Sequence, residues 1–252
     1  MSLRIPLVIA SLLTFAALGC NSAPGRPKAE PEVPRPDEVH DFALLYKQNC
    51  AACHGENGKQ GIATSLANPV YLAVAGENAL LQVTSNGVPG TLMPPFAKSA
   101  GGTLTDRQIH DLVDGMMKNW AKPASLAGQT VPPYTAAEKG DVQRGQKAFV
   151  TYCASCHGAD GAGLPSKDAQ AKHSYGSIVD PSYLALISDQ SLRTTIIAGV
   201  PDENMPDWRG YMPSHALTDQ EITDIVAWLA SHRTPYPGQP YPSLQTSQQQ
   251  PQ

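Results

Sequence analysis

Apolar residues recur at helical spacing in two segments of the chain, and each segment follows a threonine. After Thr105 and Thr218 respectively, the apolar positions are Ile109, Leu112, Val113 and Met116, and Ile222, Ile225, Val226 and Leu229. Spacings of three and four residues place such side chains on one face of an α-helix. Threonine followed by acidic or amide residues is a typical helix start. The pattern therefore predicts two equivalent helices, each with one buried face.

These two segments belong to a longer internal repeat. Cys50 and Cys153 are 103 positions apart, and the Pro-x-Tyr-Leu-Ala motifs that begin at Pro69 and Pro181 are 112 positions apart. The motifs keep their order, and the second copy has nine extra residues within 162–179. We infer a duplicated domain with about three helices in each copy. One helix leads into the cysteines, one follows the Pro-x-Tyr motif, and one follows the threonine.

Proline-rich segments separate the predicted folded regions. We expect a mainly α protein with two tandem domains at 37–121 and 140–234, joined by a proline-containing linker at 122–139. Residues 20–36 have several prolines and almost no apolar side chains, so we expect an extended tether there. The glutamine-rich end, 235–252, is expected to form an unpacked tail.

The first nineteen residues have the pattern of a secretory signal. Arg4 precedes an apolar stretch at 5–18, and Gly19 follows this stretch. A membrane-spanning helix is the alternative, but it needs about 20 apolar residues, and this stretch is shorter. We therefore expect residues 1–19 to be removed and the chain to be exported, to the periplasm or the outer face of a bacterial membrane.

The four residues from Ala17 to Cys20 resemble a bacterial lipobox, although most lipoboxes have leucine where Ala17 stands. In that family the cysteine becomes the new N-terminus and carries the lipid. Several acyl chains anchor a protein stably, whereas a single chain binds only marginally. A plain signal peptide is the alternative, and it would leave Cys20 as an unpaired thiol in an oxidising compartment. The resemblance implies a lipid anchor at Cys20.

The composition narrows the classes of partner. Charged residues make up 16% of the chain, the formal net charge is -4, and no basic cluster indicates nucleic-acid binding. An acidic surface favours docking partners that present lysines. Glycine and proline are abundant and aromatic residues are few, which is typical of compact loops between short helices.

Two Cys-x-x-Cys-His motifs carry the candidate chemistry: Cys50, Cys53 and His54 in the first repeat, and Cys153, Cys156 and His157 in the second. Covalent haem c needs two thiols one helical turn apart for its two vinyl groups, and a neighbouring histidine that reaches the iron. A zinc site shared by the two cysteine pairs is the alternative. Each pair has its own histidine and lies in its own repeat, which favours two covalently attached haem c groups.

Met93 and Met205 occupy equivalent positions of the repeat, and each precedes a proline. Methionine is a common second axial ligand of haem c, and proline stiffens the loop that presents it. Met212 also precedes a proline and competes with Met205, but the repeat alignment favours Met205. We therefore expect His54 with Met93, and His157 with Met205, as the two pairs of iron ligands.

With these motifs, both repeats resemble class I c-type cytochromes, over about 37–121 and 140–233. The resemblance implies histidine/methionine coordination, a fairly high reduction potential and one-electron transfer. The pair is similar to dihaem cytochromes of respiratory chains. We expect a membrane-anchored electron carrier or complex subunit, not an enzyme by itself. Its partners would be a quinol-oxidising complex, an oxidase or a dehydrogenase.

An enzyme is the alternative function, either peroxidase-like or thiosulfate-oxidising. Such an enzyme needs an open coordination site on one iron, or a ligand that the substrate can displace. The thiosulfate-oxidising family uses a cysteine on its active iron, whereas all five cysteines of this chain already have another expected role. A haem-based sensor would need a signalling domain, which the sequence lacks.

Class I cytochromes pair a glycine in the first helix with an aromatic residue in the last helix, where the two helices cross. The second repeat has both, as Gly145 and Trp228. The first repeat has Phe42 where the glycine belongs and Gly115 where the aromatic residue belongs. Because the summed volume is roughly kept, we expect Phe42 to project over Gly115 in an inverted crossing.

Overall fold

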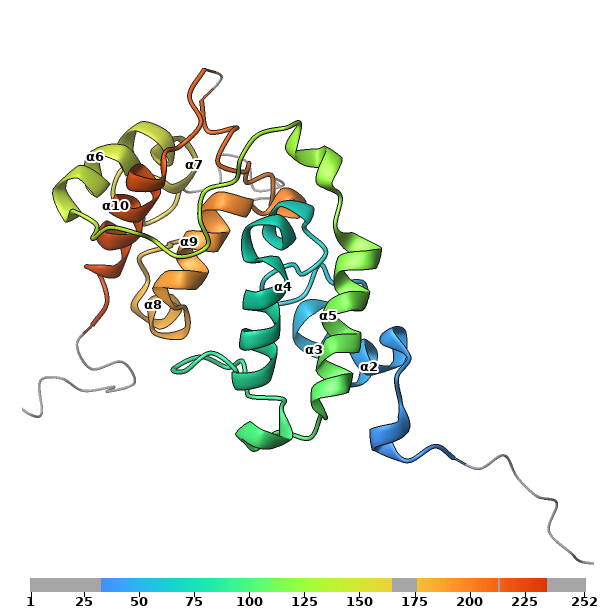
Figure 1. Cartoon of the computed structure of the whole chain (residues 1–252). Coiled ribbons are helices and arrows are strands. Elements are labelled where there is room, and N and C mark those ends of the chain that lie inside the picture. Colours follow the sequence, from blue (N-terminus) through green and yellow to red (C-terminus); the bar gives the residue numbers. More distant parts are fainter. Residues whose placement is uncertain (1–32, 165–175, 213, 235–252) are drawn as a thin grey trace, which may run out of the picture. The chain divides into compact units, whose positions relative to one another are not determined.

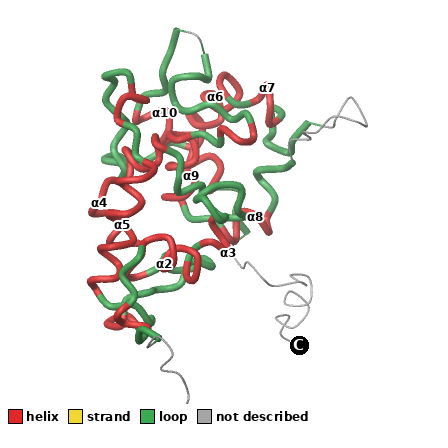
Figure 2. The backbone as a smooth tube through the Cα atoms, turned by 90° about the vertical axis from the view of Figure 1, so that its right-hand side faces the viewer, coloured by secondary structure: helices red, strands yellow, loops and turns green. Residues whose placement is uncertain are grey.

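The computed structural model describes residues 33–164, 176–212 and 214–234. Residues up to Glu38 form one unit, of which the described part holds a short 3-10 helix, Pro36–Glu38. The chain from Val39 onward forms a second unit, which contains both repeats. Within the described ranges the regular structure consists of nine α-helices and short 3-10 turns, without a β-strand (Figures 1 and 2). The expected mainly α fold with two repeats is confirmed.

Several sequence predictions lie outside the described residues. They are the signal peptide at 1–19, the lipidation site Cys20, all but the last residues of the tether, and the tail at 235–252. Most of the nine-residue insertion in the second repeat falls there as well. No helix in the described part of the chain is both long and apolar enough to cross a membrane.

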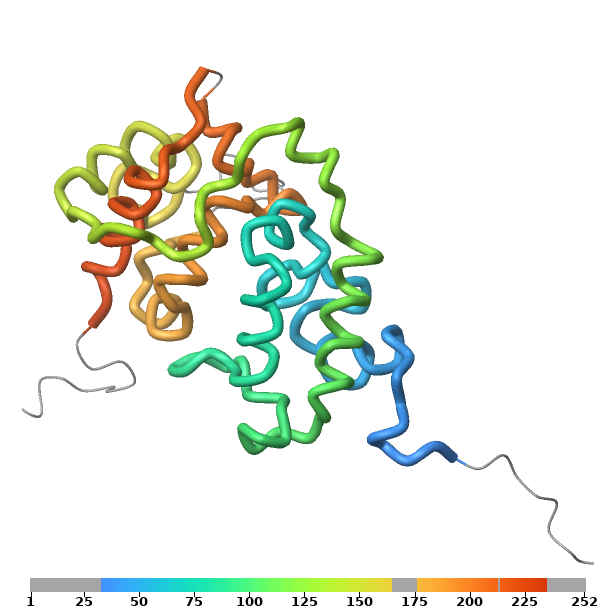
Figure 3. The backbone as a smooth tube through the Cα atoms, viewed as in Figure 1, coloured from blue at the N-terminus to red at the C-terminus, as the bar shows by residue number. Residues whose placement is uncertain are grey.

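The helices follow the same order in the two repeats. Figure 3 traces the chain through the first repeat, from blue to green, and then through the second, from yellow-green to red. The first repeat contains α2 (Phe42–Asn49), α3 (Ala51–His54), α4 (Pro69–Asn86) and α5 (Asp106–Trp120). The second contains α6 (Val142–Tyr152), α7 (Ala154–His157), α8 (Pro181–Leu186), α9 (Asp189–Ala198) and α10 (Asp219–Ala230). A short 3-10 helix, η4 (Pro123–Leu126), begins the segment between them.

The middle helix is interrupted at the same place in both repeats. In α4, Gly76 has φ 64° and ψ 170°, which breaks the helical backbone. The corresponding residue 112 positions later is Ser188, which caps α9 and separates it from α8. The predicted middle helix is therefore kinked in the first repeat and split in the second.

The predicted threonine caps are confirmed. Thr105 and Thr218 each accept a bond from the backbone three residues later, and Gln108 and Glu221 complete two capping boxes. Burial by itself raises the pKa of Glu221. Hydrogen bonds outweigh it, first from the Thr218 backbone and then from His215, and bring that pKa down to about 2. Glu221 is thus a charged cap over the ordinary pH range.

The inverted helix crossing is also confirmed. Helix α6 packs against α10 and α2 packs against α5. A Cβ atom placed on Gly145 would lie 1.9 Å from the Asp224 carbonyl oxygen and 2.9 Å from the Trp228 Cβ. A Cβ atom on Gly115 would lie 2.1 Å from the Phe42 ring. Glycine permits close approach in both crossings, but it comes from the first helix in one and from the last helix in the other.

Trp120 completes the first crossing, and the sequence comparison of the repeats does not predict it. Its ring stacks edge-on against Phe42 at 5.4 Å and against Tyr46 at 5.0 Å. A Cβ on Gly58 would touch the tip of the Trp120 indole, and a Cβ on the equivalent Gly161 would lie 3.4 Å from the tip of Trp228. The two indoles therefore reach the same place in each repeat from helix positions five residues apart.

Candidate haem sites

Each Cys-x-x-Cys-His motif forms a single helical turn, at α3 and at α7. The NH groups of Cys53 and His54 donate to the Cys50 carbonyl at 3.2 and 3.0 Å. The second repeat has the same two bonds to Cys153, with the same lengths. Residues three apart on a helix lie on one face, so each turn presents its two thiols side by side. The four thiols form no disulfide with one another.

Within each pair, the first cysteine is more buried than the second. Cys50 is half-buried and Cys153 is buried, whereas Cys53 and Cys156 are exposed. Burial, with a smaller contribution from the neighbouring cysteine, raises the pKa of Cys50 and of Cys153 to about 12. The inner thiol of each pair is therefore protonated at neutral pH, and the outer thiol lies at the surface.

His54 is buried in a defined orientation. Its Nδ1 lies 2.7 Å from the Thr64 carbonyl oxygen, which can only accept, so Nδ1 carries the proton and the Nε2 lone pair is left to bind a metal. Burial lowers the pKa of His54, and the bond to Thr64 offsets only part of this effect. Burial also lowers the pKa of the half-buried His157. Both shifts favour the neutral imidazole, which is the form that binds metals.

Glycines let the chain turn back directly after each histidine. Gly55 and Gly158 have φ values of 80° and 76°, a region that favours glycine. A Cβ on Gly55 would lie 1.9 Å from the Lys59 carbonyl oxygen, and one on Gly158 would lie 2.8 Å from the carbonyl oxygen of Gly163. The loop that follows each motif is thereby kept tight against it.

The two Met-Pro loops have the same backbone support. Val88 NH donates to the Met93 carbonyl at 3.0 Å, and Val200 NH donates to the Met205 carbonyl at 3.0 Å. A glycine with positive φ precedes each valine, and a Cβ there would lie 2.6 Å from the carbonyl oxygen of the methionine in both repeats. Both methionine side chains are half-buried. Met212 differs, because it is 38% exposed.

These donors suit covalent haem better than a shared zinc ion. Each repeat contributes two free thiols, one imidazole and one thioether, which is the set of donors that haem c uses. The imidazole is oriented by Thr64 in the first repeat and is half-buried in the second. No cluster of three or more His, Cys, Asp or Glu side chains in the described part of the chain could hold a metal ion by itself. The two cysteine pairs therefore do not come together as a zinc ribbon requires.

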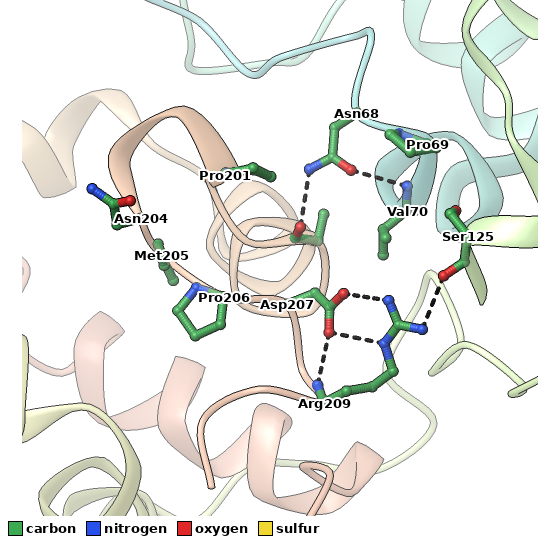
Figure 4. A pocket seen from close by; sticks show the side chains of 11 residues that line it. Asn68, Pro69, Val70, Ser125, Pro201, Asn204, Met205, Pro206, Asp207 and Arg209 are labelled. Atoms are coloured by element: carbon green, nitrogen blue, oxygen red, sulfur yellow. Dashed lines mark hydrogen bonds and ion pairs between the residues drawn. The ribbon is translucent and has the colours of Figure 1, made fainter. Parts of the chain in front are cut away.

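The second Met-Pro loop borders a cavity that residues of both repeats line (Figure 4). Its volume is about 370 Å³. The first repeat and the segment after it contribute Asn68, Pro69 and Ser125 to the lining, and the second repeat contributes Met205, Asp207 and Arg209. The sequence by itself did not indicate Asn68, Asp207 or Arg209 as site residues. An asparagine before a proline at a helix start signals a cap, but it does not reveal a contact 130 residues away.

Family models match both repeats. Residues 142–233 match the cytochrome c family, and residues 37–114 match the family of subunit III of the cbb3-type cytochrome c oxidase.

Among curated relatives, the subunit CcoP of the cbb3-type oxidase from Azospirillum sp. is 31% identical, over 59% of this chain and 54% of its own length. The cytochrome c subunit of the cytochrome bc1 complex from Corynebacterium diphtheriae is 25% identical, over 92% of this chain and 80% of its own. A thiosulfate dehydrogenase from Stutzerimonas stutzeri is 25% identical, over 74% and 60%. The chain thus spans about half the length of the CcoP relative.

The two matched regions coincide with the two copies of the internal repeat. Together they contain the four motif cysteines, the two motif histidines, Met93 and Met205. The chain belongs to the c-type cytochrome family, whose domains bind haem c covalently.

Proposed function

We propose that the protein carries two haem c groups and passes single electrons between redox proteins. The observation that carries this proposal is the duplicated donor set. Each repeat supports its Cys-x-x-Cys-His turn and its Met-Pro loop with backbone hydrogen bonds of matching length. Two equivalent haem sites in one protein are suited to the transfer of electrons from one partner to another.

The residues that would hold the haems follow from the sites described. Cys50 and Cys53 would form the thioether bonds of the first haem, with His54 and Met93 as axial ligands. In the second repeat the same roles fall to Cys153, Cys156, His157 and Met205. A bound haem supplies an iron that is reversibly oxidised and reduced by one electron. The protein orients the imidazole through Thr64 and fixes the thioether through its glycine-supported loop.

A histidine and a methionine at each haem would leave no position on the iron open to a substrate, and this favours electron transfer over chemistry on a bound substrate. The thiosulfate dehydrogenase relative nevertheless gives the enzyme alternative a specific form. Thiosulfate and cyanide separate the two functions. A carrier is reduced by thiosulfate no faster than a non-specific control cytochrome and resists millimolar cyanide. An enzyme turns thiosulfate over or exchanges a ligand readily.

The partners would be a quinol-oxidising complex, an oxidase or a dehydrogenase. Two relatives carry the names of oxidase and bc1-complex subunits, which supports this group of partners. The net charge of -4 favours partner surfaces that present lysines. The protein would act either as a tethered carrier or as a subunit, at the periplasmic or outer face of a bacterial membrane.

The ligand assignment predicts two intensities of one absorption band, a full one and a half one. Wild-type protein should contain two haems per chain. The methionine-to-iron absorption band at the red end of the visible spectrum should lose about half its intensity in Met93→Ala and in Met205→Ala. Met212→Ala is the matched control and should keep the full band. Loss of the band in Met212→Ala, with an intact band in Met205→Ala, would refute the assignment of the second site.

The proposed lipid anchor predicts where a Cys20 variant is found in the cell. Because Cys20 is the proposed lipidation site, Cys20→Ser should move the haem-containing protein from the membrane fraction to the soluble exported fraction. Haem staining of both fractions, before and after a salt wash, measures the change. A variant that stays with the membrane after the wash would show that another anchor or a bound partner holds it.

A further inference from the structure

The side chain of Asn68 makes two kinds of hydrogen bond. Its Oδ1 accepts from the NH groups of Val70 at 2.9 Å and Tyr71 at 3.4 Å, and so caps helix α4 of the first repeat. Its Nδ2 donates to the carbonyl oxygens of Ala198 at 2.9 Å and Gly199 at 3.3 Å, in the second repeat. Asn68 is only 5% exposed, so water does not readily replace these bonds.

The acceptors in the second repeat lie where the Met205 loop begins. Ala198 is the last residue of α9 and Gly199 is its C-cap. Gly199 is in close contact with the loop, because a Cβ there would lie 2.6 Å from the Met205 carbonyl oxygen. Val200 and Met205 exchange two backbone hydrogen bonds, at 3.0 and 3.1 Å. Asn68 is therefore linked to the backbone of Met205 through one short segment.

The other end of the same loop also contacts a residue outside the second repeat. Arg209 forms an ion pair with Asp207 and donates from Nη1 to the Ser125 carbonyl at 3.1 Å (Figure 4). Its guanidinium carbon also lies 4.7 Å from the centre of the Trp208 ring. Ser125 belongs to η4, which follows the last helix of the first repeat. In the first repeat, Pro95 stands two residues after the methionine and cannot form such an ion pair.

The equivalent residue of the second repeat separates the two roles of the Asn68 side chain, the helix cap and the contact with α9. Asp180 stands at the equivalent position, and its carboxylate caps α8 by accepting from Ser182 NH at 2.8 Å and Tyr183 NH at 3.2 Å. A carboxylate thus suffices for the cap. The amide NH₂ of Asn68 has no counterpart in Asp180, and this group makes the bonds to Ala198 and Gly199.

We propose that Asn68 of the first haem domain is a positioning residue for the methionine loop of the second domain. This inference rests on the proposed function, since it takes Met205 as an iron ligand. The amide of Asn68 holds the start of the loop, and the contact between Arg209 and Ser125 holds its end. Without the amide, two buried carbonyls lose their donor, and the loop can move its thioether away from the iron more often.

The test uses the full-length haem-loaded protein with Asn68→Asp and Asn68→Ser. Both replacements keep a side-chain oxygen for the cap and remove the amide donor. Serine adds no charge, so it separates the loss of the bond from the electrostatic effect of a new carboxylate. Asp180→Asn and Asp180→Ser are the matched controls. Each variant is also made in the Met93→Ala background, where the remaining methionine-to-iron band reports only on Met205.

We expect both Asn68 variants to weaken that band and to speed cyanide displacement at the second haem by about tenfold, the factor expected for one net buried hydrogen bond. The reduction potential of the second haem should fall, because methionine ligation raises it. The Asp180 controls should match the wild type. A merely structural role would lower the free energy of unfolding and leave band, exchange rate and potential unchanged, which would overturn the proposal.

Two further variants separate a failure of this inference from a failure of the proposed function. Arg209→Gln acts on the far end of the loop and should speed cyanide exchange in the same direction. If neither Asn68 variant folds with haem, an unchanged rate in Arg209→Gln overturns the proposal. If Met205→Ala in the Met93→Ala background leaves the band intact, then Met205 is not the ligand. In that case the assignment under the proposed function fails by itself.

Discussion

Gly145→Ala is expected to destabilise the protein strongly, by about 3 kcal/mol, whereas Gly115→Ala should cost about 1 kcal/mol. The reason is what the added methyl group would meet. At Gly145 it would lie 1.9 Å from the Asp224 carbonyl oxygen, which belongs to the backbone of α10. Relief requires α6 and α10 to move apart. At Gly115 it would meet the Phe42 ring, so relief requires one side chain to shift and not the backbone of a helix.

Double variants separate the two causes. Phe42→Leu removes the ring from above Gly115, so Phe42→Leu with Gly115→Ala should cost less than the sum of the single changes. Trp228→Leu keeps the Cβ and does not move the Asp224 carbonyl, so it should give no such relief to Gly145→Ala. Denaturant unfolding of the haem-loaded variants measures the free energies. Gly176→Ala is the control, because a Cβ there meets nothing within 4 Å. Equal losses at Gly145 and Gly115 would contradict this account of the crossings.

Arg193→Met should cost about 3 kcal/mol, since it removes a buried cation together with several satisfied hydrogen bonds. The Arg193 side chain is 3% exposed and pairs with Asp219. Its guanidinium also donates to the carbonyl oxygens of Pro133 and Tyr134, at 2.8 to 3.1 Å, and to the Thr223 hydroxyl at 3.0 Å. The change therefore removes three of the hydrogen bonds that hold the linker on α9 and α10, while Gln190 Nε2 still donates to the Tyr134 carbonyl at 2.7 Å.

The linker supplies a second measurement. We expect Arg193→Met to speed limited proteolysis at 130–139, beyond the change that lower stability alone causes in other loops. Arg193→Lys should recover little, because an ammonium group cannot reach this many acceptors in one plane. Arg107→Met is the matched control, since Arg107 is 76% exposed and its ion pair with Asp111 contributes less than about 0.5 kcal/mol. An Arg193→Met protein with wild-type stability and wild-type cleavage would refute this role.

Local physics explains why much of the molecule could be predicted from its sequence. The capping boxes at Thr105 and Thr218 depend on residues three apart, and the Cys-x-x-Cys-His turns depend on bonds within five residues. The duplication added information that one copy would lack, because it paired Met93 with Met205 and predicted the inverted crossing of Phe42 and Gly115. Such features repeat wherever the same short pattern recurs.

The interruption of the middle helix and the role of Trp120 were not predictable in the same way. Gly76 and Ser188 are both compatible with a continuous helix, and only the backbone shows that one kinks it and the other splits it. Trp120 reaches Gly58 from a position that does not align with Trp228. Close packing requires that a space be filled, but it does not require that the same position fill it.

By itself the sequence determined the first and last helix of each repeat, the threonine caps and the two Cys-x-x-Cys-His motifs, because each depends on residues a few positions apart. The tertiary structure alone decided that Asn68 meets the end of α9, that Arg209 meets Ser125, and that Arg193 holds the linker. These contacts join residues 59 to 130 positions apart. They depend on which surfaces meet once the helices have packed, and no periodicity or short motif records that choice.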